Sequence, residues 1–69
     1  MDQLMRLKID IDMVNLAFEG EDCGPEVARI LRALADRCED WSYSRFVNEA
    51  MVKLYDFNGN NVGKAEIVE

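Results

Sequence analysis

Residues 5–13 alternate strictly between apolar and charged side chains, and this alternation restricts the fold more than any other stretch. The apolar set is Met5, Leu7, Ile9, Ile11 and Met13, and the charged set is Arg6, Lys8, Asp10 and Asp12. Successive side chains of a strand point to opposite faces, so the pattern predicts a half-buried strand of an antiparallel sheet. The mostly apolar residues 14–18 are expected to extend this strand through a bend or a bulge.

A helical pattern follows the acidic loop at residues 19–24. Its apolar stripe consists of Val27, Ile30, Leu31, Leu34 and Cys38, which recur at the spacing of an α-helix. Pro25 suits the first helical position and Glu26 suits the positive end of the helix dipole, so we predict a helix from residue 25 to about residue 39. The expected solvated face carries Glu26, Arg29, Arg32, Asp36, Arg37 and Asp40.

The C-terminal part of the chain has the pattern of a β-hairpin. Residues 51–57 and 62–68 have the pattern of strands, and the Asn-Gly-Asn-Asn sequence at 58–61 tolerates the positive φ angles of a tight turn. Residues 41–50 leave two interpretations open. Ser44 suits the cap of a short helix that carries Phe46, Val47 and Ala50, or the segment is a long loop; we favour the helix.

A chain of 69 residues closes one core, so we expect a single domain over residues 1–69. The element order predicts an α+β fold, a three-stranded antiparallel β-α-β-β sheet with one main helix on one face and a short second helix at 44–50. All neighbouring strands run antiparallel if the first pairs with the third. The other face of the sheet then stays largely open, with the charges of the first strand and either Lys53 and Tyr55 or their alternating neighbours.

The residue types argue against catalysis. The chain has no His, so the usual general base of a Ser or Cys nucleophile and the commonest zinc ligand are missing. Cys23 and Cys38 should lie roughly 20 Å apart along the helix, too far for a disulfide, and unpaired thiols suit a reducing compartment. Asp10 and Asp12 share a strand face, but Arg6 and Lys8 beside them favour a charge-balanced surface over an acid/base pair. We therefore expect no enzymatic activity and no cofactor.

Asp56 begins a sequence with some likeness to a calcium-binding loop, because Asp56, Asn58 and Asn60 stand at its first, third and fifth positions. The likeness ends there, since Asn61 and Ile67 occupy the places of the required Gly and Glu. Turn chemistry explains the Asp and Asn residues, and we expect no bound metal.

The charge of the chain indicates what kind of partner it suits. The formal net charge is −6, from 14 acidic and 8 basic residues, which opposes direct binding to nucleic acid and to anionic membranes. The same charge favours a protein or ribonucleoprotein with a basic surface. The sequence lacks the apolar run of about 18–20 residues that crosses a bilayer and a recognisable leader, so we expect a cytoplasmic protein, as a monomer or a homodimer.

The candidate partner-binding surface consists of acidic and aromatic side chains near the two ends of the predicted helix. It contains Glu19, Glu21, Asp22, Glu26, Asp36, Glu39, Asp40, Trp41 and Tyr43. Carboxylates can face the Arg and Lys residues of a partner as a phosphate backbone does, and aromatic residues are frequent interface anchors. Two other interpretations stay open: the acidic excess keeps a small protein soluble, and the aromatic residues close one end of the core.

Two segments, EVARILRALAD at 26–36 and DFNGNNVGKAEI at 56–67, resemble small uncharacterised proteins encoded by bacteriophages and prophages. The first strand and residues 15–18 are also similar to such proteins, whereas residues 41–50 are not. The resemblance implies a phage protein that binds and inhibits a nucleic-acid-handling defence complex in the host cytoplasm, an anti-CRISPR-like inhibitor that blocks DNA binding through protein contacts. The alternative is a self-associating structural or accessory module, which would use an exposed sheet edge or the open sheet face.

Overall fold

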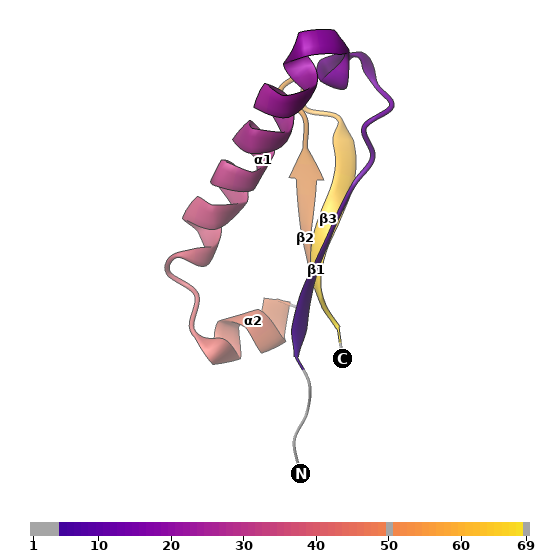
Figure 1. The fold of residues 1–69 in the computed structure, drawn as a ribbon. Helices are drawn as coiled ribbons and strands as arrows, with labels where there is room; N and C mark the ends of the chain where they lie inside the picture. The colour runs from indigo at the N-terminus through magenta and orange to yellow at the C-terminus, as the bar shows by residue number, and fades with distance from the viewer. Residues whose placement is uncertain (1–4, 50, 69) are drawn as a thin grey trace.

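The computed structural model describes residues 5–49 and 51–68 and confirms the predicted α+β fold with β-α-β-β order. A three-stranded sheet lies on one side of the main helix, and a short second helix follows it (Figure 1). The elements are β1 (Arg6–Ile11), the 3-10 helices η1 (Leu16–Phe18) and η2 (Gly20–Asp22), α1 (Cys23–Cys38), α2 (Tyr43–Glu49), β2 (Met51–Tyr55) and β3 (Asn61–Val68).

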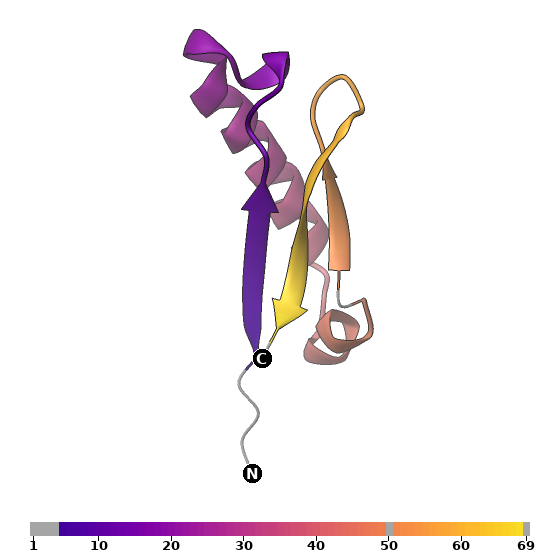
Figure 2. The same cartoon turned by 90° about the vertical axis from the view of Figure 1, so that its right-hand side faces the viewer.

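The sheet has the order β1-β3-β2, and both pairs of neighbouring strands are antiparallel, as predicted (Figure 2). The ladder between β1 and β3 runs without interruption from Arg6 opposite Val68 to Ile11 opposite Gly63. The ladder between β2 and β3 has an irregularity after Leu54. Lys53 and Tyr55 lie on the open face, because their neighbours Val52 and Leu54 are the residues of β2 that are buried.

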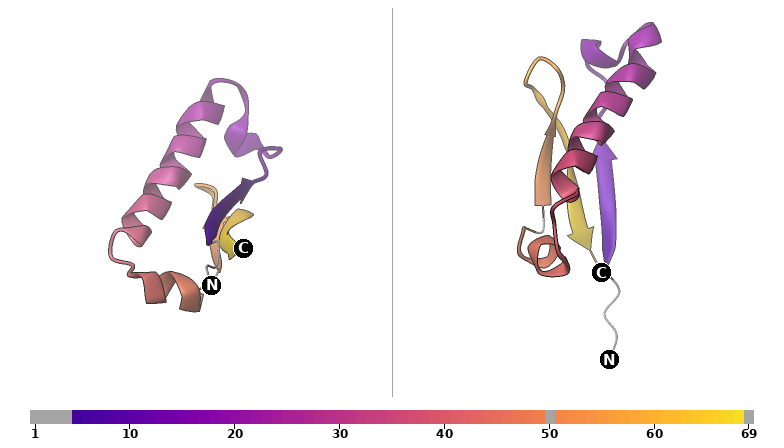
Figure 3. Two further views of the ribbon diagram at one scale, coloured as in Figure 1. Left: turned by 60° about the horizontal axis from the view of Figure 1, so that its bottom comes forward. Right: turned by 90° about the vertical axis from the view of Figure 1, so that its left-hand side faces the viewer.

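Helix α1 crosses one face of the sheet obliquely (Figures 1 and 3). Its residues Ile30 and Leu34 are buried in the core, whereas Leu31 is exposed although it belongs to the predicted apolar stripe. The helix begins at Cys23, two residues before Pro25, so the prediction that Pro25 is its first residue is wrong. The core contains Ala17, Phe18, Ile30, Leu34, Val52, Leu54, Val62 and Ala65.

Residues 14–18 do not extend β1, and this prediction is wrong. The side-chain oxygen of Asn15 accepts a hydrogen bond of 2.7 Å from the backbone N–H of Ala17 and thereby begins η1. The turn directs Ala17 and Phe18 into the core, where both are buried. Ala17 and Phe18 therefore close the core beside the start of α1, whereas Val14 and Leu16 stay exposed.

The segment 41–50 contains the short helix α2, which confirms the helical interpretation. Its capping residue is Ser42 and not Ser44, because the hydroxyl of Ser42 accepts a hydrogen bond of 3.3 Å from the backbone N–H of Arg45. Phe46 is half-buried and Val47 is exposed, while Ala50 lies outside the described residues.

The β2–β3 hairpin forms as the Asn and Gly residues predict, but β2 ends at Tyr55 instead of residue 57 and β3 begins at Asn61, so the connection spans residues 56–60. Gly59 has φ of 86°, a conformation that L side chains rarely adopt, and its N–H donates a 3.0 Å hydrogen bond to the carbonyl of Asp56. Gly63 serves a different purpose: a Cβ atom at this position would overlap the backbone carbonyl oxygen of Asp10. The absence of a side chain at Gly63 therefore allows β1 and β3 to approach each other closely.

Candidate functional site

Glu26 is the first charged residue that the structure places differently from the sequence prediction. Its side chain is only 6% exposed, so the prediction of a solvated position on the outer face of the helix is wrong. Both carboxylate oxygens accept hydrogen bonds of 2.9 Å from Arg29, and one also accepts the backbone N–H of Phe57 at 2.9 Å. Arg29 in turn donates to the carbonyl oxygen of Tyr55 at 3.0 Å. This pair ties α1 to the end of β2.

Asp56 is the second buried carboxylate, with 4% of its surface exposed. One oxygen accepts the backbone N–H groups of Asn58 and Asn60 at 2.9 and 2.8 Å. The other accepts the side-chain amides of Asn15 and Asn60 at 2.7 and 3.2 Å. Asp56 thus joins the hairpin turn to the segment before η1, which lies 41 residues earlier in the chain.

These contacts shift both carboxyl groups toward the charged form. The hydrogen bond from Arg29 is the main cause that lowers the pKa of Glu26 below its ordinary value, and it outweighs the opposing effect of burial. Burial alone would raise the pKa of Asp56, but the donors of Asn60, Asn15 and Asn58 together hold it below its ordinary value. Both groups are therefore carboxylates at neutral pH.

We expect stability to be constant near neutral pH and to fall in acid. A carboxyl group whose pKa is lower in the folded state stabilises the fold fully above its unfolded pKa, and that stabilisation disappears as the pH falls through the folded value. The urea midpoint should therefore be the same at pH 7 and 6 and should decline below about pH 4–5. Glu26→Gln should be less stable at pH 7 and should show a smaller decline in acid, whereas Glu19→Gln at an exposed position should follow the wild type.

The hydrogen bonds of both buried carboxylates are made within the fold, to donors of α1, the hairpin and Asn15. In residues 5–49 and 51–68, every buried side-chain nitrogen or oxygen has a hydrogen-bond partner. Within the same ranges no group of three or more His, Cys, Asp and Glu residues is placed to hold a metal ion. The acceptors of Asp56 face N–H donors of the hairpin turn and of Asn15, which is the turn chemistry that the sequence indicates.

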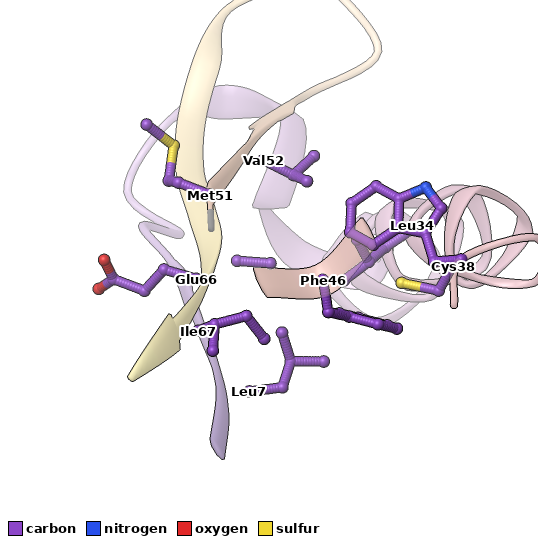
Figure 4. A pocket seen from close by; sticks show the side chains of 10 residues that line it. Leu7, Leu34, Cys38, Phe46, Met51, Val52, Glu66 and Ile67 are labelled. Carbon is purple, nitrogen blue, oxygen red and sulfur yellow. The ribbon is translucent and has the colours of Figure 1, made fainter. Parts of the chain in front are cut away.

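An apolar cavity lies between the sheet and the C-terminal half of α1, but it is too small for a substrate. Its volume is about 10 Å³, close to the space of one water molecule. Figure 4 shows that Leu7 and Ile67 point toward Phe46, while Met51 and Glu66 point away from the centre. We conclude that this cavity is a packing gap where α1 and the sheet diverge.

The exposed acidic residues of the predicted partner-binding surface form two separate groups, at opposite ends of α1. Glu19, Glu21 and Asp22 precede the helix, and we call them the acidic end; Asp36, Glu39 and Asp40 belong to or follow its last turns. All six are exposed, but a helix of 16 residues separates the groups by about 24 Å. The predicted surface is therefore two patches, and Glu26 belongs to neither because it is buried.

The acidic end lies beside exposed apolar side chains and an open groove. Val14 and Leu16 precede it and are exposed, and Phe57 on the hairpin is exposed as well. The groove has a volume of about 320 Å³ and is lined by Ala17, Asp22, Pro25, Glu26, Arg29 and Phe57. No Lys or Arg occurs between Lys8 and Arg29 in the sequence. Carboxylates and apolar groups thus meet here with few compensating cations.

The second acidic group, Asp36, Glu39 and Asp40, lies next to aromatic residues that pack within the fold. Trp41 packs against the core and meets Phe46 edge to face, with their ring centroids 5.0 Å apart. Arg45 lies over the Trp41 ring at 5.4 Å, so one face of this aromatic residue is covered by a cation of the same chain. Tyr43 is the exposed aromatic residue of this region. The apolar surface of Trp41 is used largely within the fold.

Comparison with protein-family models, with curated proteins and with solved structures found no match to this chain. Among the helices of the described residues, none combines the length and apolar character needed to cross a membrane. The fold and its surfaces therefore define the class of the molecule as a small acidic α+β protein with an exposed acidic and apolar end.

Proposed function

We propose that the chain is a non-catalytic binding protein whose acidic end docks onto a basic macromolecular surface. The observation that carries the proposal is that Asp22 lines the groove at Phe57 and that the exposed Glu19 and Glu21 come just before it in the chain. Interfaces combine apolar anchors with charged groups that orient the partner, and both occur here within one end of the molecule.

The groove suits an Arg or Lys side chain of the partner. The aliphatic part of such a side chain would pack against Pro25 and Phe57, and its charged group would lie near Asp22. Contact with the face of Phe57 would add a cation–π interaction, and Arg would form charge-assisted hydrogen bonds with the carboxylate. The acidic end is preferred over the group at Asp36, because Arg37 directly follows Asp36 and Trp41 is packed inside. Arg29 also lines the groove at the acidic end, but its guanidinium is paired with Glu26.

Two matched charge-reversal variants test the surface. Glu19→Lys with Glu21→Lys should reduce capture of the partner about 10- to 100-fold, since complementary charges determine association rates. Asp36→Lys with Glu39→Lys changes the net charge by the same amount and should reduce capture much less. A tagged chain incubated with bacterial lysate and analysed by quantitative mass spectrometry measures both. Equal losses in the two variants would show an effect of net charge and contradict the assignment.

The finer proposal concerns the partner. The resemblance of residues 26–36 and 56–67 to phage proteins and the net charge of −6 support an inhibitor of a host nucleic-acid-handling complex of the CRISPR type, active in the host cytoplasm. The purified chain should then compete with DNA for such a complex in an electrophoretic shift assay. If the chain captures a partner but does not change DNA binding by that partner, the proposed docking surface stands and the inhibitory role is rejected.

A further inference from the structure

No strand among residues 5–49 and 51–68 pairs with the outer edge of β1, and the apolar side chains of this strand stay about half exposed. β1 is an outer strand of the sheet, and α1 does not cover the first half of β1 (Figures 2 and 3). Leu7 and Ile9 face the helix side of the sheet together with Ala65 and Ile67, yet they are 47% and 42% exposed. An exposed strand edge with adjacent apolar side chains is a template for pairing with another strand.

The backbone geometry determines which groups this edge offers. The N–H of Asp12 donates to the carbonyl of Val62 at 2.7 Å, so the even-numbered residues of this strand direct their backbone groups toward β3. The odd-numbered residues Leu7, Ile9 and Ile11 then direct theirs toward the free edge. A second β1 strand can pair there only in registers that place odd-numbered residues opposite odd-numbered residues.

The charges of β1 select one of these registers for a second copy of the same strand. When Ile9 lies opposite Ile9 of the second copy, Arg6 faces Asp12 and Lys8 faces Asp10, and each of these pairs occurs twice by symmetry. The two neighbouring allowed registers are less favourable. The register with Leu7 opposite Ile9 of the second copy places Lys8 opposite Lys8, and the register with Ile9 opposite Ile11 places Asp10 opposite Asp10. The charge sequence of residues 6–12 is therefore complementary to itself in one antiparallel register.

We propose that two copies of this chain pair along β1 in this register and form a continuous six-stranded antiparallel sheet. Leu7 lies opposite Ile11 of the second copy, and the pairing adds roughly six backbone hydrogen bonds. The ion pairs lie at the closely spaced positions of the ladder, on the open face of the sheet. Leu7 and Ile9 become covered on the other face. The proposal goes beyond the proposed docking function and does not depend on it.

The experiment measures the mass of the full chain by light scattering over a concentration series that extends to about 1 mM. The wild type should reach twice the chain mass of 7.9 kDa. Arg6→Glu and Asp12→Lys should each weaken the dimer about tenfold or more, because each variant places like charges opposite each other twice. Arg6 lies opposite Val68 within the chain, so its reversal places no like charge directly opposite it on β3. Circular dichroism checks that both variants fold.

The decisive measurement mixes the two variants. Arg6→Glu and Asp12→Lys chains are complementary to each other, so the mixture should recover the dimer that each lacks alone. Lys53→Glu on β2, at the other edge of the sheet, should leave the wild-type dimer unchanged. A wild-type chain that stays monomeric throughout, a mixture no more dimeric than its components, or a dimer that responds only to Lys53→Glu would each overturn the proposal.

Discussion

Asp56→Ala is expected to lower the thermal unfolding midpoint by roughly 10 °C or more, measured by circular dichroism at pH 7. The carboxylate accepts four hydrogen bonds, from Asn15, from Asn58 and twice from Asn60. Its removal would leave these donors without their acceptor and would leave a gap where the Asp56 side chain, 4% exposed, now lies. Because these donors come from both the hairpin turn and the segment before η1, the variant should also loosen the attachment of that segment.

A conservative variant at Asp56 distinguishes the loss of hydrogen-bond acceptors from the loss of side-chain volume. Asp56→Asn keeps the shape and one oxygen, but its amide nitrogen would face the side-chain amides of Asn15 and Asn60. An intermediate midpoint is therefore expected. Asp36→Ala removes an exposed carboxylate and should change the midpoint by little. A midpoint for Asp56→Ala within the scatter of the wild type would show that the network is dispensable.

Phe18→Ala is expected to destabilise the fold by about 3–5 kcal/mol, measured by urea unfolding. Phe18 is 4% exposed and belongs to the core although it lies in the short 3-10 helix η1. A domain of 69 residues has a total stability of about 3–10 kcal/mol, so this loss should leave a large unfolded population. The physical reason is the cavity that truncation of a buried aromatic ring leaves behind.

Leu16→Ala is the matched control, two residues earlier in the same 3-10 helix. Leu16 is 75% exposed, so its truncation should change the stability by no more than about 0.5 kcal/mol. Similar losses in the two variants would mean that residues 16–18 pack differently in solution. If these residues instead continued β1, successive side chains would alternate between faces, and Ala17 would not be buried directly beside Phe18.

The local patterns of the sequence predicted the elements, but not all of their bounds. The alternation at residues 5–13 predicted β1, the helical spacing predicted α1, and the Asn and Gly residues predicted the hairpin. The error at residues 14–18 has a specific cause. An apolar run does not distinguish a strand from a turn that enters the core, and the decisive hydrogen bond from Ala17 to Asn15 is a property of the folded backbone.

For the candidate sites, too, the sequence predicted some properties and only the folded structure decided others. The acidic residues near both ends of the helix were recognisable from charge alone, and so was their exposure at Glu19, Glu21 and Asp22. Glu26 could not be distinguished from them by its residue type. Its burial follows from Arg29 on the next helical turn and from the backbone of Phe57, which lies 31 residues later in the chain.

The order of side chains along each segment thus determined which secondary structures form and that the surface is acidic, because these properties depend on near neighbours in the chain. Only the tertiary structure decided that Glu26 and Asp56 are internal, that the acidic groups are separated by the length of α1, and that Leu7 and Ile9 stay about half exposed on an outer strand. Each of these depends on contacts between segments distant in the sequence, which a local pattern does not specify.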